Sequence, residues 1–312
     1  METSTVAGLE ISRVGLGTNN FGRNVDAAGT ARVVHAAIDA GVTFIDTADK
    51  YGGTLSEEFI GRALVGRRDD VVLATKFGMA VDDDPLHSGA SRRWILEAVE
   101  HSLRRLQTDV IDLYQVHWPD PETPIEETLE TLGELRQAGK IRAAGCSNFS
   151  AEQLVEAAAA VESHQGLAPL VAAQNEYSLL QRDVDENGLL AACAANGVGF
   201  TPYYPLASGL LTGKYQPGEP PPTGSRFAVV DRYQPMWTER NLNLAARLAD
   251  FATERGHRPV DLAVSWLLAR PSVVSVICGA TKPEQVASNA TAGNWELTDE
   301  EMRELDAMTL ED

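Results

Sequence analysis

Short, β-branched apolar runs alternate with longer amphipathic stretches along the whole chain, and this alternation limits the fold more than any other property of the sequence. The runs lie at residues 14–18, 43–48, 71–76, 111–117, 141–148, 171–178, 197–204 and 274–280. Each is mostly continuous in apolar character, which is typical of parallel strands covered on both faces. Helical periodicity occupies residues 26–40, 56–65, 92–106, 125–138, 151–163 and 186–196 between them.

Eight strands that alternate with helices, without a break in composition, predict an α/β fold with one closed (β/α)8 TIM barrel over residues 1–312. An open doubly wound sheet is the alternative, although such sheets usually have fewer strands and a glycine fingerprint after the first. We expect residues 3–13 to form a hairpin plug at the bottom of the barrel and residues 297–310 to form an extra C-terminal helix. Residues 216–237 are rich in Pro and Gly, which predicts a long ligand-binding loop.

The excess of acidic residues limits which kinds of macromolecule or membrane the chain can bind. The chain has 26 Lys and Arg against 45 Asp and Glu, a net charge of −19 at pH 7. Such a surface repels phosphate backbones and anionic lipid, so we expect no nucleic-acid or membrane partner. Cys146, Cys193 and Cys278 are scattered and form no CxxC pair. With no signal peptide at the N-terminus, this pattern favours a reduced, cytoplasmic protein without a metal site; the oligomeric state stays open.

Polar residues stand where the predicted strands end, which is where barrels place their active sites. Asp46, Lys76 and His117 end the second, third and fourth strands, and Tyr51 follows Asp46 by five residues. Any one of them has an ordinary structural explanation, because a strand-end lysine is usually solvated and a single histidine is often only packed. Together they form a complete acid–base device.

The chemistry of such a device suits a carbonyl group. Tyrosine titrates near ~10 in water, and we expect the Lys76 ammonium to favour the phenolate while Asp46 holds the lysine charged. A neutral His117 can hydrogen-bond the carbonyl oxygen and fix its direction. Tyr51 would then protonate that oxygen while a hydride reaches the carbon, and a hydride requires a cofactor.

Residues 41–52, with Glu57 and Gly61 after them, resemble the aldo-keto reductase signature. Further blocks that resemble this family lie at residues 14–22, 74–78, 112–120, 139–150, 174–180, 204–215 and 279–289. The resemblance covers nearly the whole chain and implies a barrel that binds NADP(H) across the C-terminal ends of its strands. It also implies that Tyr51 is the general acid, that Lys76 and Asp46 tune it, and that His117 orients the carbonyl.

The same resemblance implies a set of cofactor contacts. Ser147, Asn148 and Gln174 would hold the carboxamide, and Tyr203 would stack on the nicotinamide ring. The 216–237 segment would close over the cofactor, with Leu206, Ser208, Lys214 and Arg226 at the pyrophosphate. Gly279, Thr281, Lys282, Gln285 and Asn289 match the adenosine end. The set is completed by Gly17, Thr18, Asn19, Asp46, Tyr204 and Pro205.

Two matters of specificity follow. Thr281 stands where many relatives have arginine, so the sequence favours NADPH but leaves room for NADH. Phe21, Phe77 and Trp118 lie just past strand ends and are candidate contacts for a small-molecule carbonyl substrate; simple packing is the alternative for each. The natural substrate and the physiological direction are not defined by these residues.

Two other functions compete with a reductase. The 216–237 segment and residues 213–215 also resemble the β subunits of voltage-gated potassium channels, which suggests a cofactor-binding regulatory module. Those subunits typically have asparagine at the position of His117, so the intact set of four favours the enzyme. Alternatively, Lys76 inside a barrel could form a Schiff base, as in an aldolase.

Overall fold

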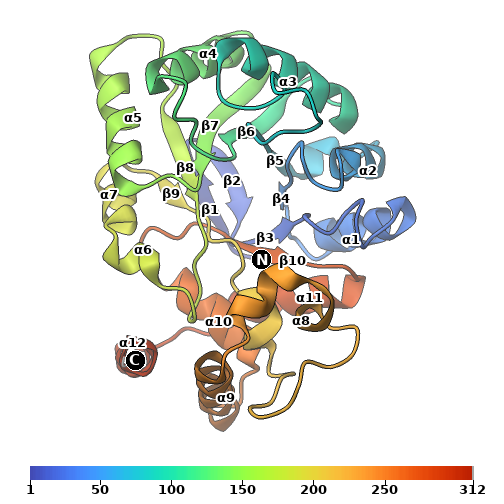
Figure 1. The fold of residues 1–312 in the computed structure, drawn as a ribbon, viewed down its shortest axis with the longest axis vertical. Helices are drawn as coiled ribbons and strands as arrows, with labels where there is room; N and C mark the ends of the chain where they lie inside the picture. The colour runs from blue at the N-terminus through green and yellow to red at the C-terminus, as the bar shows by residue number, and fades with distance from the viewer. Residues whose placement is uncertain (311–312) are drawn as a thin grey trace.

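A computed structural model describes residues 1–310, and its centre is a ring of eight parallel strands (Figure 1). The strands are β3 (Val14–Gly17), β4 (Phe44–Asp46), β5 (Val72–Phe77), β6 (Ile111–Val116), β7 (Ile141–Ser147), β8 (Leu170–Gln174), β9 (Gly199–Phe200) and β10 (Val276–Gly279). They pair in the order β10-β3-β4-β5-β6-β7-β8-β9. The two ends of this order meet, because the backbone N–H groups of Val274 and Ile277 donate to the carbonyls of Phe200 and Pro202, each at 3.0 Å. The predicted (β/α)8 barrel is confirmed.

Helices cover the outside of the ring (Figure 1). They are α1 (Ala27–Asp39), α2 (Leu55–Ala63), α3 (Arg92–Leu106), α4 (Ile125–Gln137), α5 (Ala151–Ser163), α6 (Asp183–Glu186), α7 (Leu189–Ala195), α8 (Arg226–Val229), α9 (Glu239–Glu254), α10 (Pro259–Leu268), α11 (Pro283–Thr291) and α12 (Asp299–Leu310). Short 3-10 turns lie at η1 (Arg68–Asp70), η2 (Ala207–Thr212), η3 (Asp231–Met236) and η4 (Ala292–Asn294). The expected C-terminal helix is α12. Within residues 1–310, we find no helix with the length and apolar character needed to cross a bilayer.

The predicted helix over residues 186–196 is wrong at its start. The structure has two helices there, α6 and α7, separated at Gly188. Gly188 has φ of +81° and is the N-cap of α7. This left-handed conformation suits glycine and cannot continue a helix, so the first helix ends before it.

The N-terminal hairpin plugs the barrel as expected. Its strands are β1 (Thr3–Val6) and β2 (Leu9–Ser12), which pair antiparallel. Val6 and Ile11 pack inside the ring with an apolar cluster that includes Phe44, Leu113 and Ile277. The bottom of the barrel is therefore closed by apolar packing, which leaves the C-terminal ends of the strands for a site.

The alternation of side chains along each strand sets what lies above that apolar layer. Phe44 belongs to the inner cluster, Ile45 packs outward against the helices, and Asp46 comes next. Because successive strand residues face opposite sides, Asp46 faces inward like Phe44. By the same alternation, Lys76 faces inward two residues after Ala74. The inside of the ring therefore has a polar layer above an apolar one.

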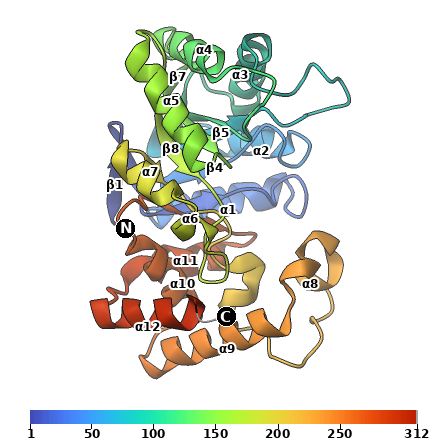
Figure 2. The same cartoon turned by 60° about the vertical axis from the view of Figure 1, so that its left-hand side comes forward.

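The segment 216–237, predicted to be a long loop, contains short helical turns. It contains α8 and η3, and Figure 2 shows it on the α9 side of the molecule. Phe227 is fully buried between Tyr215 and Trp237, with ring centroids 5.4 and 5.0 Å away. A few well-spaced aromatic residues order this segment without any apolar periodicity.

Candidate active site

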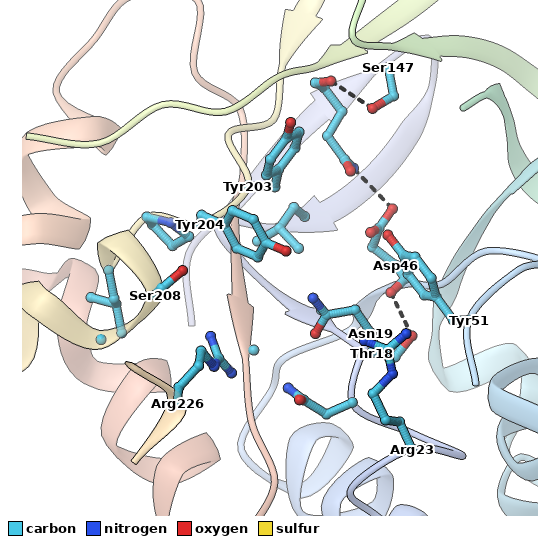
Figure 3. Close-up of a pocket in the computed structure, with 18 of the residues that line it drawn as sticks. Thr18, Asn19, Arg23, Asp46, Tyr51, Ser147, Tyr203, Tyr204, Ser208 and Arg226 are labelled. Atoms are coloured by element: carbon cyan, nitrogen blue, oxygen red, sulfur yellow. Dashed lines mark hydrogen bonds between the residues drawn. The ribbon is translucent and has the colours of Figure 1, made fainter. Parts of the chain in front are cut away.

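The C-terminal ends of the strands surround a cavity of about 540 Å³ (Figure 3). Its floor is Asp46, which ends β4, and its walls come from the segments that follow β3, β4, β6, β7 and β9. Tyr51 and His117 line it, so three of the four residues expected to form the acid–base device reach one cavity. The fourth, Lys76, lies behind them and is fully buried.

Lys76 and Asp46 form a buried ion pair. The Lys76 Nζ donates to Oδ2 of Asp46 at 2.7 Å and to the carbonyl of Thr47 at 2.8 Å. Oδ1 of Asp46 accepts from the side-chain amides of Gln174 at 3.0 Å and Gln115 at 3.3 Å. The carboxylate thus receives donors on both oxygens, which fixes its position and that of the lysine opposite it.

Tyr51 lies over this pair. Its ring centre is 5.1 Å from the Lys76 Nζ and 5.7 Å from the centre of the His117 ring, which it meets edge-on. Tyr51 is half-buried and His117 is 7% exposed. The phenol and the imidazole are therefore close enough to contact the same small group in the cavity.

The charges around Tyr51 correct one expectation. Burial raises the pKa of Tyr51 above its ordinary value, and the carboxylates of Asp46 and Asp49 raise it further; the cation that lowers it is Arg232. The lowering that we expected from Lys76 does not prevail, because burial and the two carboxylates raise the pKa of the phenol. The phenol consequently stays protonated, which suits a proton donor rather than a base.

His117 is held neutral. Burial, reinforced by the Lys76 ammonium, lowers the pKa of His117 to about 3. Its Nδ1 atom is buried and has no hydrogen-bond partner among residues 1–310. Burial also lowers the pKa of Lys76, and Asp46 acts in the opposite direction. The site thus holds a neutral phenol, a neutral imidazole and a compensated ion pair.

Most of the expected cofactor residues line this cavity. They are Gly17, Thr18, Asn19, Asp46, Ser147, Asn148, Gln174, Tyr203, Tyr204, Pro205, Leu206, Ser208, Lys214, Arg226, Gly279 and Gln285. Thr281, Lys282 and Asn289 do not. Thr281 donates from its N–H and its hydroxyl to Oε1 of Gln285, and Lys282 is an exposed N-cap of α11. These residues border the cavity at its β10 end.

The polar side chains at the β7 and β8 ends are already organised. Asn148 has φ of 62°, in the left-handed region that asparagine adopts more readily than most residues other than glycine. Its amide donates to the His117 carbonyl at 2.9 Å, and its Oδ1 accepts from the Tyr203 hydroxyl at 2.8 Å. The Ser147 hydroxyl donates to the carbonyl of Gln174 at 2.8 Å (Figure 3). This network holds Tyr203 in place at the cavity wall.

Of the three candidate substrate contacts, one lines the cavity and two are buried in the core. Trp118 lines the cavity and is 51% exposed. Phe21 and Phe77 do not line it, and both are fully buried. Phe77 follows the inward-facing Lys76, so it points outward and packs on Tyr114, with ring centroids 4.7 Å apart. The structure therefore places Phe21 and Phe77 in the core between strands and helices, which is the packing alternative.

Several lining residues escaped the sequence analysis. Arg232 is one, because nothing marked a role for it within a segment predicted to be a loop. Gln115, which does not line the cavity but donates to Asp46, could also have been found, since it lies two residues after the inward-facing Leu113. The other cavity-lining residues that were not singled out are Asn20, Arg23, Lys50, Gly52, Met79, Gly209, Thr212 and Ile277.

The burial of Lys76 also bears on the Schiff-base alternative. Its Nζ is committed to Asp46 and to a backbone carbonyl, and the side chain does not line the cavity. A lysine that attacks a carbonyl must be neutral and must reach the substrate. The geometry argues against that role.

Comparisons with known proteins agree on one family. The sequence profile described as "Aldo/keto reductase family" matches residues 13–309. The chain is 39% identical to "Aldo-keto reductase YhdN" of Bacillus subtilis (strain 168), over 99% of this chain and 93% of the relative. It is 36% identical to "L-glyceraldehyde 3-phosphate reductase" of Escherichia coli (strain K12), over 96% of this chain and 89% of the relative. A "Probable voltage-gated potassium channel subunit beta" of Oryza sativa subsp. japonica is also 36% identical, over 92% of this chain and 88% of the relative.

Proposed function

Because this chain belongs to the aldo/keto reductase family, we propose that it is a cytoplasmic, NADPH-dependent oxidoreductase that reduces an aldehyde, ketone or sugar carbonyl to the alcohol. The observation that carries the proposal is the arrangement of Tyr51 and His117 over the buried Lys76–Asp46 pair, inside a cavity at the strand ends. The proposal takes residues 1–312 as one domain, since β3 and β10, from the two ends of the chain, pair with each other.

The protein's own residues account for the proton in this reaction. Tyr51 is protonated at neutral pH, so it can donate its proton to the carbonyl oxygen as negative charge develops there. The neutral His117 can donate a hydrogen bond to the same oxygen and fix the direction of the carbonyl. Once Tyr51 becomes a phenolate, the Lys76 ammonium beneath its ring stabilises the new charge.

A bound nicotinamide cofactor would supply the hydride, and the residues around the cavity fit such a group. Lys214 and Arg226 line it and provide cations for a pyrophosphate. The Ser208 hydroxyl is buried without a hydrogen-bond partner among residues 1–310, and Ser208 is held at φ of 57°. An unpartnered hydroxyl in a strained turn fits a polar ligand at that point. Lys282 at the start of α11 would hold the 2′-phosphate that distinguishes NADPH from NADH.

The test of this function is consumption of NADPH in the presence of a reactive aromatic aldehyde. Turnover with NADPH, and formation of the corresponding alcohol in equal amount, would support the reductase. Absence of turnover with aldehydes, ketones and sugars, despite NADPH binding, would contradict it.

A second candidate function is a cofactor-binding regulatory module. The observation that favours it is the 36% identity to a probable channel β subunit over 92% of this chain. This alternative predicts tight NADPH binding with little turnover, so the same assay separates the two functions.

A further inference from the structure

Three neighbouring strand ends place one basic and two apolar side chains beside the proposed proton donor. Lys50 directly precedes Tyr51 after β4, Met79 follows β5 and Trp118 follows β6, and all four residues line the cavity. The strands β4, β5 and β6 are neighbours in the ring, so the segments that follow them lie at one side of its rim. The cavity therefore has a wall here that the proposed proton transfer and the cofactor do not use.

Backbone hydrogen bonds fix these strand ends relative to one another. The N–H of Asp49 donates to the carbonyl of Lys76 at 3.1 Å, and the N–H of His117 donates to the carbonyl of Phe77 at 2.8 Å. Met79 is only two residues beyond that Phe77 carbonyl, and consecutive Cα atoms are about 3.8 Å apart. Met79 consequently lies at the reacting end of the cavity, close to His117.

The β5–α3 loop, residues 78–90, carries Met79 and is held at its base and on its outer side. At the base, the N–H of Gly89 donates to the carbonyl of Gly78 at 2.9 Å. Away from the cavity, the His87 ring stacks on Trp94 of α3, with ring centroids 4.8 Å apart. The loop is therefore a braced arm rather than a free end.

The β5–α3 loop also touches the segment that carries Trp118. Oδ2 of Asp120, two residues after Trp118, accepts from the N–H of Ala90 at 2.7 Å. A Cβ atom on Gly89 would lie 2.6 Å from the same oxygen, so the two segments are in close contact there. Met79 and Trp118 thus belong to segments that are fixed to each other, and together they form an apolar part of the cavity wall.

Lys50 connects this wall to the segment of the proton donor. Its Nζ donates to the carbonyl of Ala80, the residue after Met79. Such a bond is charge-assisted and stronger than one between neutral groups. Because Lys50 directly precedes Tyr51, the bond fixes the β5–α3 loop relative to the phenol.

We propose that the β5–α3 loop selects substrates by size, and that Lys50 is the positioning residue that holds Met79 in the cavity wall. The substrate class is then a carbonyl compound with a compact apolar substituent, which contacts the Met79 thioether and the Trp118 indole. This inference rests on the proposed reductase function and names its substrate class. A bulkier substituent has to displace the loop, which the bond from Lys50 to Ala80 opposes.

The experiment compares benzaldehyde with 2-naphthaldehyde, two aromatic aldehydes that differ by one fused ring. We expect the wild type to favour benzaldehyde in kcat/KM. Lys50→Met keeps an unbranched apolar side chain but removes the ammonium. It should raise the ratio of kcat/KM for 2-naphthaldehyde to that for benzaldehyde by about tenfold or more, the scale of losing a hydrogen bond to a charged group. The change should come from a lower KM for 2-naphthaldehyde, with kcat for benzaldehyde within about threefold of the wild-type value.

A second variant and a second measurement separate the lining residue from the residue that holds it. Met79→Ala shortens the wall and should raise the same ratio by several-fold. Amide hydrogen exchange of residues 79–88, with NADP+ present, should become about tenfold faster in Lys50→Met and stay unchanged in Met79→Ala. Lys50→Arg, which keeps a cationic donor, should restore slow exchange and the wild-type ratio.

Lys140→Met is the matched control. Lys140 directly precedes β7, at the end of the ring opposite the cavity, and pairs with Glu100. The aldehyde ratio, the exchange of residues 79–88 and the Kd of NADPH should all keep their wild-type values. Equal changes in kcat/KM for both aldehydes in Lys50→Met, or wild-type exchange in that variant, would overturn the role of Lys50. A ratio that is unchanged in Met79→Ala would overturn the size-selecting wall.

A failure of the reductase function would look different. In that case the wild type reduces neither aldehyde, and the exchange of residues 79–88 still reports whether Lys50 holds the loop. Size selection is then measured by calorimetric binding of benzyl alcohol and 2-naphthalenemethanol with NADP+ present. Relatively tighter binding of the larger alcohol in Lys50→Met would support the wall in a protein that is not a reductase. The wild-type ratio of affinities, or no binding of either alcohol, would overturn it.

Discussion

The Nζ of Lys76 and Oδ2 of Asp46 are 2.7 Å apart, and both side chains are almost completely removed from solvent. Two charges without water depend on each other, because the loss of one leaves the other unpaired. Lys76 is also the group beneath the Tyr51 ring, so this pair connects the stability of the barrel to its chemistry.

Breaking the pair should destabilise the protein strongly. We expect Asp46→Leu to lower the free energy of unfolding by about 3–5 kcal/mol, because it leaves the Lys76 ammonium buried without a counterion. The double variant Asp46→Leu/Lys76→Met should regain a large part of that loss, since it removes both charges. Guanidinium unfolding of the wild type, Asp46→Leu, Lys76→Met and the double variant tests this; a double variant whose loss equals the sum of the two single losses would show that the two residues do not depend on each other.

His117 should make stability fall at acid pH. Its pKa is about 3 in the folded chain, below the ordinary value of 6.5, so the unfolded chain binds the proton more readily. This contribution is complete above about pH 6.5 and is lost as pH falls, by up to about 1.4 kcal/mol per pH unit, until the folded pKa is reached. The His117→Gln variant should lack this slope, which chemical unfolding at a series of pH values measures. Parallel slopes for both proteins would place the ionisation elsewhere.

Asp49 should act in the opposite direction. Its carboxyl is 1% exposed, neither oxygen has a hydrogen-bond partner among residues 1–310, and burial, with the charge of Glu57, raises its pKa well above 3.8. The folded chain therefore binds this proton more tightly than the unfolded chain, and stability falls as pH rises from the unfolded pKa through the folded one. Arg105 and Lys50 oppose the shift without cancelling it.

The matching experiment is Asp49→Asn. The variant should gain stability relative to wild type as the pH is raised from about 5 to about 8, because it has no charge to bury. Thermal unfolding of both proteins across this range is the measurement. A difference in Tm that stays constant with pH would mean that Asp49 does not titrate there.

Lys282 should decide between the two nicotinamide cofactors. It is an exposed N-cap at the start of α11, beside the β10 end of the cavity. Lys282→Ala should weaken NADPH binding by several-fold and leave NADH binding nearly unchanged, since only NADPH carries the 2′-phosphate. Fluorescence titration of each cofactor measures both constants. Equal weakening of the two would remove Lys282 from the 2′-phosphate.

The strands and most helices could be predicted because their signal is local. Continuous apolar runs located all eight strands of the ring, and periodicity gave α3 and α5 with their observed bounds. The split between α6 and α7 was missed because one glycine, Gly188, outweighs the periodicity on either side of it. The order in 216–237 was missed because Phe227 and Tyr233 pack on aromatic residues of the same region rather than at a helical spacing.

For the site, too, the positions of several residues could be predicted from the sequence, whereas their surroundings could not. Strand ends predicted where Asp46, Lys76 and His117 lie, because parallel strands bring their C-terminal ends together. Phe77 was a candidate substrate contact with packing as its alternative; strand alternation turns it outward from the inward-facing Lys76, and it packs on Tyr114. The pKa of Tyr51 could not be predicted from the sequence either, because it depends on Asp49 and Arg232, whose distances from the phenol are set by the fold.

The role of Tyr51 as the proton donor is tested most directly by the rate of NADPH oxidation with an aldehyde substrate, in the wild type and in Tyr51→Phe. The substitution removes one hydroxyl and keeps the ring over Lys76, so the Kd of NADPH should stay within a few-fold of the wild-type value. Turnover should fall by about 10²- to 10⁴-fold, the contribution of a general acid. A Tyr51→Phe variant that binds NADPH normally and keeps wild-type turnover would contradict the account.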